Sequence, residues 1–188
     1  DSVKIIEVPY PEPSFLDKVL PTVSSNNDVI NLVFAGRAEY AKGINIIHKL
    51  AIDFPSVNFH IIGEIIVEKS TLKNIKYYGR VKQQELFSIF LNCDALIFPS
   101  YSEGSSFVTL EAKSLGLPGI VSFQSGSHYK DGFDGFIFDA FNYEDCFNCV
   151  NKFVLDKDLR FKFKKNILLT KYSVDDYSKN LREVICQK

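Results

Sequence analysis

The sequence contains no methionine and no tryptophan, and it has only three histidines. Its 22 lysines and arginines nearly balance its 23 aspartates and glutamates, so the net charge of −1 gives no indication of a nucleic-acid surface. No apolar run approaches the length of a membrane span, and no signal-peptide pattern opens the chain. A length of 188 residues with 46% hydrophobic residues indicates one ordinary globular domain.

Two common phosphate-binding signatures are also missing. There is no Gly-x-Gly-x-x-Gly and no Walker-type loop, which disfavours dinucleotide-binding and P-loop proteins. The four cysteines are irregularly placed, which argues against a disulfide scaffold and favours a reducing, cytoplasmic setting. Cys146 and Cys149 form a Cys-x-x-Cys, but no second pair or histidine is near in sequence, so buried helix thiols are favoured over zinc or redox chemistry.

Apolar runs and helical patterns alternate along the chain. Strands are expected at 31–36, 57–62, 75–78, 95–98, 119–123 and 136–138, and helices at 44–54, 83–92, 107–115, 143–155, 158–170 and 174–186. This alternation predicts an α/β fold, a Rossmann-like parallel sheet with helices on both faces. Residues 1–28 are interpreted as an entry segment with a short strand at 4–8, and residues 171–188 as a terminal helix.

The stretch from 95 to 118 combines a strand, a polar turn and a helix. Pro99 ends the strand, and the helix is expected to bury Phe107, Leu110, Ala112 and Leu115. The first N–H groups of a helix and its dipole favour an anion. Gly104 allows a ligand to approach the backbone, and Ser105 and Ser106 can cap the helix or donate hydroxyl groups. The stretch therefore predicts a phosphate site.

Two carboxylates accompany this turn. At a rise of ~1.5 Å per residue, Glu111 lies about 8–10 Å from the phosphate-binding amides, roughly the span from a diphosphate to a ribose. A carboxylate can accept two hydrogen bonds from a vicinal diol, which suits that sugar. The alternative is that Glu103 only caps the helix and Glu111 is a solvated surface residue. The presence of both around one turn favours the nucleotide site.

Two cations stand in the loop after the strand that ends at Gly36. Arg37 and Lys42 lie at the carboxyl end of that strand, where open α/β sheets bind ligands. Such a pair suits a diphosphate, although solvation at the surface is the usual fate of lysine and arginine.

Glu103 to Glu111 is a Glu-x7-Glu motif, with Pro99-Ser100 before it and Gly116-Leu117-Pro118 after it. This set resembles the donor-site signature of the retaining GT-B glycosyltransferases of family 4, over nearly the whole chain. The resemblance implies that residues 1–188 are one nucleotide-sugar-binding domain, the C-terminal half of a GT-B enzyme whose N-terminal acceptor domain is absent. The lack of methionine and the start at Asp1 fit that expectation.

The resemblance also implies roles for individual residues. Glu103, Arg37 and Lys42 are the implied catalytic residues: Glu103 orients the transferred sugar, and the two cations neutralise the leaving diphosphate. The implied donor-binding residues are Gly36, Arg37, Lys42, Gly79, Val81, Glu103, Gly104, Ser105, Ser106, Phe107 and Glu111. No metal and no cofactor besides the nucleotide-diphosphate sugar are expected, because cations and helix amides can neutralise its charge.

The implied reaction transfers a sugar, with retention, to a glycan or lipid-linked acceptor in polysaccharide biosynthesis. The missing domain is expected to hold that acceptor and to provide any peripheral membrane association, so this domain alone is expected to bind nucleotide but to turn over little.

Three features depart from the family pattern. Gly104-Ser105-Ser106 replaces a frequent Gly-Phe-Gly, residues 125–130 contain no glutamate, and Lys113 stands where methionine is common. Two other classes remain open. A nucleotide-sugar epimerase or phosphorylase would need further acid/base groups or a cofactor lysine. A non-catalytic interaction module predicts no nucleotide affinity and an unexposed or paired Glu111.

Overall fold

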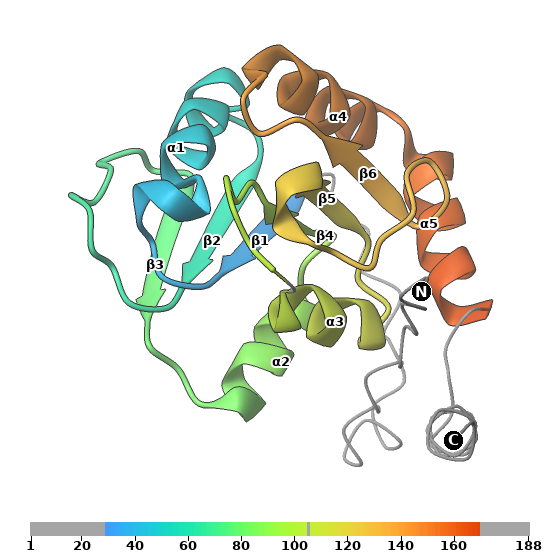
Figure 1. Cartoon of the computed structure of the whole chain (residues 1–188), viewed down its shortest axis with the longest axis horizontal. Coiled ribbons are helices and arrows are strands. Elements are labelled where there is room, and N and C mark those ends of the chain that lie inside the picture. The colour runs from blue at the N-terminus through green and yellow to red at the C-terminus, as the bar shows by residue number, and fades with distance from the viewer. Residues whose placement is uncertain (1–28, 105, 170–188) are drawn as a thin grey trace, which may run out of the picture.

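A computed structural model describes residues 29–104 and 106–169 (Figure 1). Its centre is a six-stranded parallel sheet in the order β3-β2-β1-β4-β5-β6. The strands are β1 (Asn31–Ala35), β2 (Asn58–Ile62), β3 (Ile75–Gly79), β4 (Ala95–Phe98), β5 (Gly119–Ser122) and β6 (Gly135–Phe138). The strand order reverses between β1 and β4, and ligands of open α/β sheets bind at such a point.

Helices cover both faces of the sheet, so the predicted α/β architecture is confirmed. The helices are α1 (Ile44–Asp53), α2 (Gln83–Leu91), α3 (Phe107–Ser114), α4 (Tyr143–Leu155) and α5 (Lys157–Leu169), with 3-10 turns η2 (Tyr40–Lys42) and η3 (Phe123–Ser125). Figure 1 shows α1 and α4 on one side of the sheet and α2 and α3 on the other. The strand expected at 4–8 and the helix expected at 174–186 lie outside the described residues.

The core is built from strands that are apolar along their length. Every residue of β4 and β5 is buried, as is β1 from Leu32 to Ala35. Continuous apolar runs are typical of parallel strands that are covered on both faces. Cys146 and Cys149 are buried in α4, which confirms that they are core thiols, and Cys93 is buried too; Cys186 lies outside the described residues.

The prediction for the buried side of α3 was partly wrong. Ala112 and Leu115 are buried as expected, but Leu110 is only half-buried and Phe107 is 68% exposed. Thr109 is buried although it was not expected to be. At 100° per residue, Phe107 lies about 200° around the helix from Thr109, which puts it on the side facing away from the sheet. The apolar residues alone did not show which side of this short helix packs inward.

Two glycines allow the loops at the carboxyl ends of the strands to touch. Gly43 has φ +77, and a Cβ there would lie 2.0 Å from the carbonyl oxygen of Pro99. Gly63 has φ +123, and its Cβ would lie 2.0 Å from the carbonyl oxygen of Gly36. Only glycine combines these dihedral angles with such close contact. The loops after β1, β2 and β4 are therefore pressed together at one edge of the sheet.

Candidate functional site

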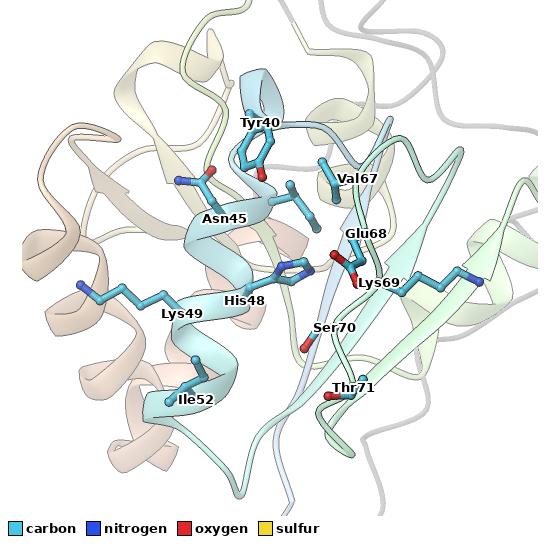
Figure 2. Close-up of a pocket in the computed structure, with 11 residues that line it drawn as sticks. Tyr40, Asn45, His48, Lys49, Ile52, Val67, Glu68, Lys69, Ser70 and Thr71 are labelled. Carbon is cyan, nitrogen blue, oxygen red and sulfur yellow. The ribbon is translucent and has the colours of Figure 1, made fainter.

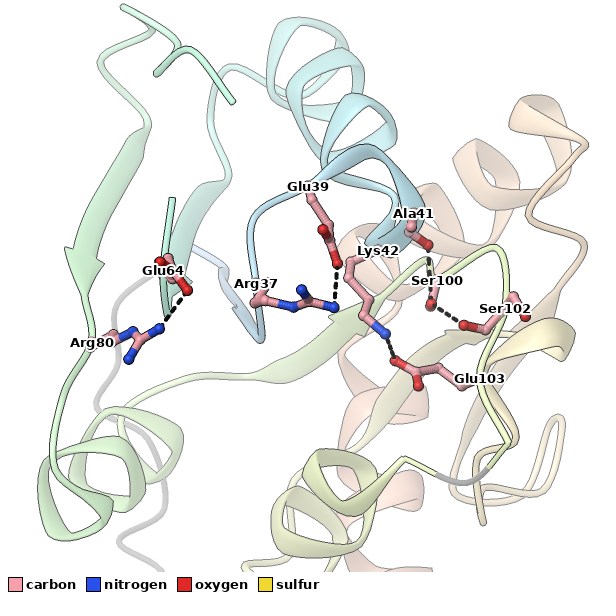
Figure 3. Close-up of polar contacts among 9 residues, drawn as sticks. All are labelled: Arg37, Glu39, Ala41, Lys42, Glu64, Arg80, Ser100, Ser102 and Glu103. Carbon is pink, nitrogen blue, oxygen red and sulfur yellow. Dashed lines mark hydrogen bonds and ion pairs between the residues drawn. The ribbon is translucent and has the colours of Figure 1, made fainter. Parts of the chain in front are cut away.

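The loops after β1 and β4 bring two of the predicted catalytic residues into contact. The backbone N–H of Tyr101 donates to the carbonyl of Ala41 (3.0 Å), and the Ser100 hydroxyl donates to the same carbonyl (3.3 Å). These bonds hold the two loops together, and the Lys42 ammonium pairs with Oε1 of Glu103 (Figure 3). Both side chains are mostly shielded from solvent, with exposures of 18% and 21%. The pair stands at the point where the strand order reverses.

Arg37 lies in the same loop as Lys42 but is much more open to solvent. Its side chain is 60% exposed and pairs with Glu39 at 3.0 Å (Figure 3). Gly36 directly follows β1 and donates its N–H to the carbonyl of Ile62 (2.9 Å). The loop therefore offers one cation held by Glu103 and a second held by a neighbouring carboxylate at the surface.

The turn after β4 is supported by the end of β5 and the segment that follows it. The N–H of Glu103 donates to the carbonyl of Gln124 (2.9 Å), and the Ser122 hydroxyl donates to the carbonyl of Ser100 (2.6 Å). Gly126 has φ +56, and a Cβ there would lie 2.5 Å from the carbonyl oxygen of Gly104. A Cβ on Gly104 itself would meet no atom within 4 Å. The turn is thus packed from behind, and Gly104 opens to the other side.

Ser106 occupies the N-cap position of α3, as the sequence predicted, but not in the expected way. Its backbone is extended and its side chain makes no capping hydrogen bond. Instead its carbonyl accepts a bond from the Thr109 hydroxyl (2.7 Å). The Ser106 hydroxyl therefore accepts no hydrogen bond from the backbone N–H groups at the start of α3. Ser105 lies outside the described residues.

Glu111 is neither fully solvated nor strongly paired. It is half-buried on α3, and Nε2 of Gln83 donates to its Oε1 at 3.4 Å, linking α2 with α3. Burial raises the pKa of the Glu111 carboxyl group, and the bond from Gln83 offsets this only in part. Glu111 is therefore only partly solvated, and the long bond leaves its second oxygen available for a ligand.

Two of the predicted donor-binding residues, Gly79 and Val81, lie at the end of β3 and in the loop after it. Gly79 has φ +73 and accepts the N–H of Gly63 through its carbonyl (2.8 Å). Arg80 next to it pairs with Glu64 at 2.5 Å; the Arg80 side chain is largely exposed and that of Glu64 about half-exposed (Figure 3). Val81 packs partly buried against the core. This loop therefore lies beside the loop after β2, at the same edge of the sheet as Lys42.

Several partners of these residues were not predicted from the sequence. Glu39 and Glu64 hold Arg37 and Arg80, and Asp134 holds Lys113. Glu64 directly follows Gly63, just as Arg37 directly follows Gly36. This repeated glycine-charge pair could have indicated that Glu64 lies near the site. The other pairings depend on how the loops fold.

A cavity of about 580 Å³ lies between α1 and residues 67–71 (Figure 2). The side chains of Lys49 and Lys69 point away from it, and those of His48 and Glu68 point toward each other across it. None of the described residues predicted to bind the donor lines this cavity. The predicted donor site and this cavity are separate features.

Within residues 29–104 and 106–169, no three histidine, cysteine, aspartate or glutamate side chains gather where they could hold a metal ion. In the same residues, no helix is long and apolar enough to cross a membrane.

Comparison with known proteins places the chain in a family. An uncharacterized 41.2 kDa protein from the cps region of Klebsiella pneumoniae is 37% identical over 100 residues, which are 50% of this chain and 27% of that protein. The C-terminal domain of a group 1 glycosyl transferase family protein from Francisella tularensis superposes with a TM-score of 0.66 at 20% identity, covering 77% of this chain and 87% of that one.

Anabaena HepE, solved with UDP and glucose, superposes with a TM-score of 0.71 at 15% identity, covering 86% of this chain but 49% of HepE. The fold is thus that of the C-terminal domains of GT-B glycosyltransferases. The family model described as glycosyl transferases group 1 matches residues 20–169. Because this match spans well over half of the sequence, the chain belongs to the glycosyl transferases group 1 family.

Proposed function

We propose that this chain binds the nucleotide-sugar donor of a retaining glycosyltransferase that transfers a hexose to a glycan or lipid-linked acceptor. The observation that carries the proposal is the Lys42–Glu103 pair at the point where the strand order reverses. It places a cation for a diphosphate beside a carboxylate for a sugar hydroxyl. Anabaena HepE, which shares the fold, was solved with UDP and glucose bound.

The cations would act on the leaving group. As the bond from the sugar carbon to the diphosphate breaks, negative charge grows on the diphosphate oxygens. Lys42 and Arg37, with the amides at the start of α3, would stabilise this charge without a metal ion. The donor diphosphate would draw the Lys42 ammonium away from Glu103, which leaves the carboxylate to accept hydrogen bonds from the sugar.

Glu111 would hold the other end of the donor. Its second carboxylate oxygen can accept from one ribose hydroxyl, and displacement of Gln83 would free the first oxygen for the other. Gly79 and Val81 would border the base. An acceptor domain elsewhere in the whole protein would complete the cleft, so this domain alone would bind nucleotide and transfer little sugar.

A non-catalytic interaction module is the competing reading, and it predicts a paired Glu111. Gln83 does reach this residue, but only at the long distance of 3.4 Å. A partner held that weakly is easily displaced by a ribose diol, so the bond does not favour the competing reading.

Calorimetric titration with UDP, GDP and ADP, with and without Mg²⁺, tests the proposal. We expect saturable binding of one nucleotide without metal, and a loss of about 1–3 kcal/mol in Glu111→Ala, which removes one or two hydrogen bonds. Arg37→Ala should weaken binding as well, while Lys162→Ala, an exposed lysine of α5, should leave it unchanged. Absence of binding for all three nucleotides would support the interaction module instead.

A further inference from the structure

Lys113 connects α3 to residues 124–134, the segment that packs against the turn that carries Glu103. Its Nζ lies 2.8 Å from Oδ2 of Asp134 and donates to the carbonyl of His128 (2.6 Å). The Lys113 side chain is 21% exposed and that of Asp134 only 1%. Oδ2 of Asp134 accepts no hydrogen bond from the described residues, so the ion pair with Lys113 is what compensates this buried charge. The contact therefore ties α3 to residues 128–134.

The far half of that segment, residues 128–134, is held by its own hydrogen bonds and packing. Oδ1 of Asp134 accepts the backbone N–H of Lys130 (2.7 Å), which closes the chain into a tight turn. Tyr129 is buried, and its hydroxyl donates to the carbonyl of Leu117 (2.7 Å). Its ring lies so close to Gly119 that a Cβ on Gly119 would be 2.5 Å from it. These contacts keep the shape of residues 128–134, and Lys113 fixes that shape against α3.

The near half of the segment touches the donor turn. The carbonyl of Gln124 accepts the N–H of Glu103 (2.9 Å), and Gly126 packs on the carbonyl of Gly104. Three residues separate Gln124 from His128, whose carbonyl accepts a hydrogen bond from Lys113. A shift at His128 is thus carried along a short stretch of chain to the backbone of Glu103 and Gly104.

We propose that Lys113 is a positioning residue for the donor turn. It holds residues 124–134 against α3, and through them it sets the place of the Glu103 carboxylate and the Gly104 backbone. This inference rests on the proposed function, because it matters for activity only if that turn binds the donor. An apolar side chain at this position would fill the space but would hold neither His128 nor Asp134.

Hydrogen exchange of the ligand-free chain tests the positioning without any nucleotide. In Lys113→Met the Glu103 amide, which is bonded to Gln124, should exchange about tenfold faster, while the Gly36 amide, bonded to Ile62, should not change. Lys113→Arg keeps the charge and should restore slow exchange at Glu103. Equal exchange at Glu103 in wild type and Lys113→Met would overturn the proposal.

Nucleotide binding separates positioning from mere stability. The double variant Lys113→Met with Asp134→Asn leaves no buried unpaired charge and keeps an oxygen for the Lys130 N–H, so its melting temperature should recover toward that of the wild type. Its affinity for UDP, or for whichever nucleotide binds the wild type, should stay about tenfold weaker, as in Lys113→Met alone. Recovery of affinity together with stability would show that Lys113 is only structural. If the wild type binds no nucleotide, the proposed function fails, and the exchange experiment still decides the role of Lys113.

Discussion

The Lys42 ammonium is paired with the Glu103 carboxylate, although the two residues are 61 positions apart and follow different strands. In the ligand-free chain, the carboxylate therefore neutralises the cation that the proposed function assigns to the diphosphate. A donor must compete with Glu103 for this ammonium. The pair thus links the affinity for the diphosphate to the charge of the residue that would orient the sugar.

Glu103→Gln should bind UDP more tightly than the wild type. The amide leaves the Lys42 ammonium uncompensated, so the diphosphate no longer displaces a carboxylate from it. We expect a gain of about threefold to tenfold, because the pair is only partly shielded from solvent. Calorimetry measures the change, and sugar transfer by the whole protein should fall at the same time.

Glu39→Gln is the matched control for this prediction. It removes the partner of the largely exposed Arg37, where solvent already screens the charge, so its effect on UDP affinity should be smaller. If Glu103→Gln bound UDP no better than the wild type, Lys42 would not be a diphosphate ligand.

Glu111 should make the stability of the chain depend on pH. Burial raises the pKa of its carboxyl group, so the folded chain holds this proton more tightly than the unfolded chain does. The contribution of Glu111 to the free energy of unfolding is therefore full below the unfolded pKa of about 4.3 and is lost as pH rises through the raised folded value. Urea unfolding of the wild type and Glu111→Gln from pH 4 to 7 should show this decline only in the wild type, after subtraction of the slope common to both. Parallel curves would mean that Glu111 is solvated.

The same ionisation should act on nucleotide binding with the opposite sign. The ribose diol needs the charged carboxylate, so affinity should rise with pH through the raised pKa of Glu111. The terminal phosphate of UDP also titrates, with a pKa of about 6, and this affects every variant equally. The difference in pH dependence between wild type and Glu111→Gln isolates the protein group. If the ratio of the two affinities stayed constant across the pH range, Glu111 would not be a ligand of the ribose.

Most of the fold could be predicted because its strands are short, apolar and bounded by glycine, proline or polar residues. Ala95–Phe98 was predicted to the residue, and Asn31–Ala35 to within one. The side of α3 that packs inward could not be predicted, because this helix has only eight residues and its apolar positions point in several directions. In the folded chain, Thr109 and Ala112 are buried and Phe107 is exposed.

For the candidate site, the sequence identified the loops but not the pairs within them. Arg37, Lys42 and Glu103 were each singled out from their place at the end of a strand. That Lys42 rather than Arg37 meets Glu103 depends on the close contact of the loops after β1 and β4, which no local pattern encodes. The Lys113–Asp134 pair is of the same kind, since it joins a helix to a distant turn.

The cysteines should be unreactive until the chain unfolds. Cys93, Cys146 and Cys149 are buried free thiols, and burial raises the pKa of Cys93 and of Cys149 to about 12 and that of Cys146 well above its usual value. In a Cys186→Ser background, a thiol reagent such as DTNB at pH 8 should label none of the three in native buffer and all of them in urea. Rapid labelling of Cys149 in native buffer would reopen the redox reading of the Cys-x-x-Cys.

Gly43→Ala should lower the free energy of unfolding more than Gly79→Ala does. Both glycines have left-handed backbones, with φ of +77 and +73, so each alanine costs about 1–2 kcal/mol in strain. A Cβ at Gly79 meets nothing within 4 Å, whereas at Gly43 it would lie 2.0 Å from the Pro99 carbonyl oxygen. That overlap should add about 1–3 kcal/mol, as overpacking does elsewhere.

Urea unfolding of the two variants measures this difference with the strain held equal. Because Pro99 begins the turn that leads to Glu103, the overlap at Gly43 should also separate Lys42 from Glu103, and UDP affinity should fall beyond the loss of stability. Equal destabilisation by both alanines would show that Gly43 is required only for its dihedral angle. The contact between the loops after β1 and β4 would then not be what holds the ion pair together.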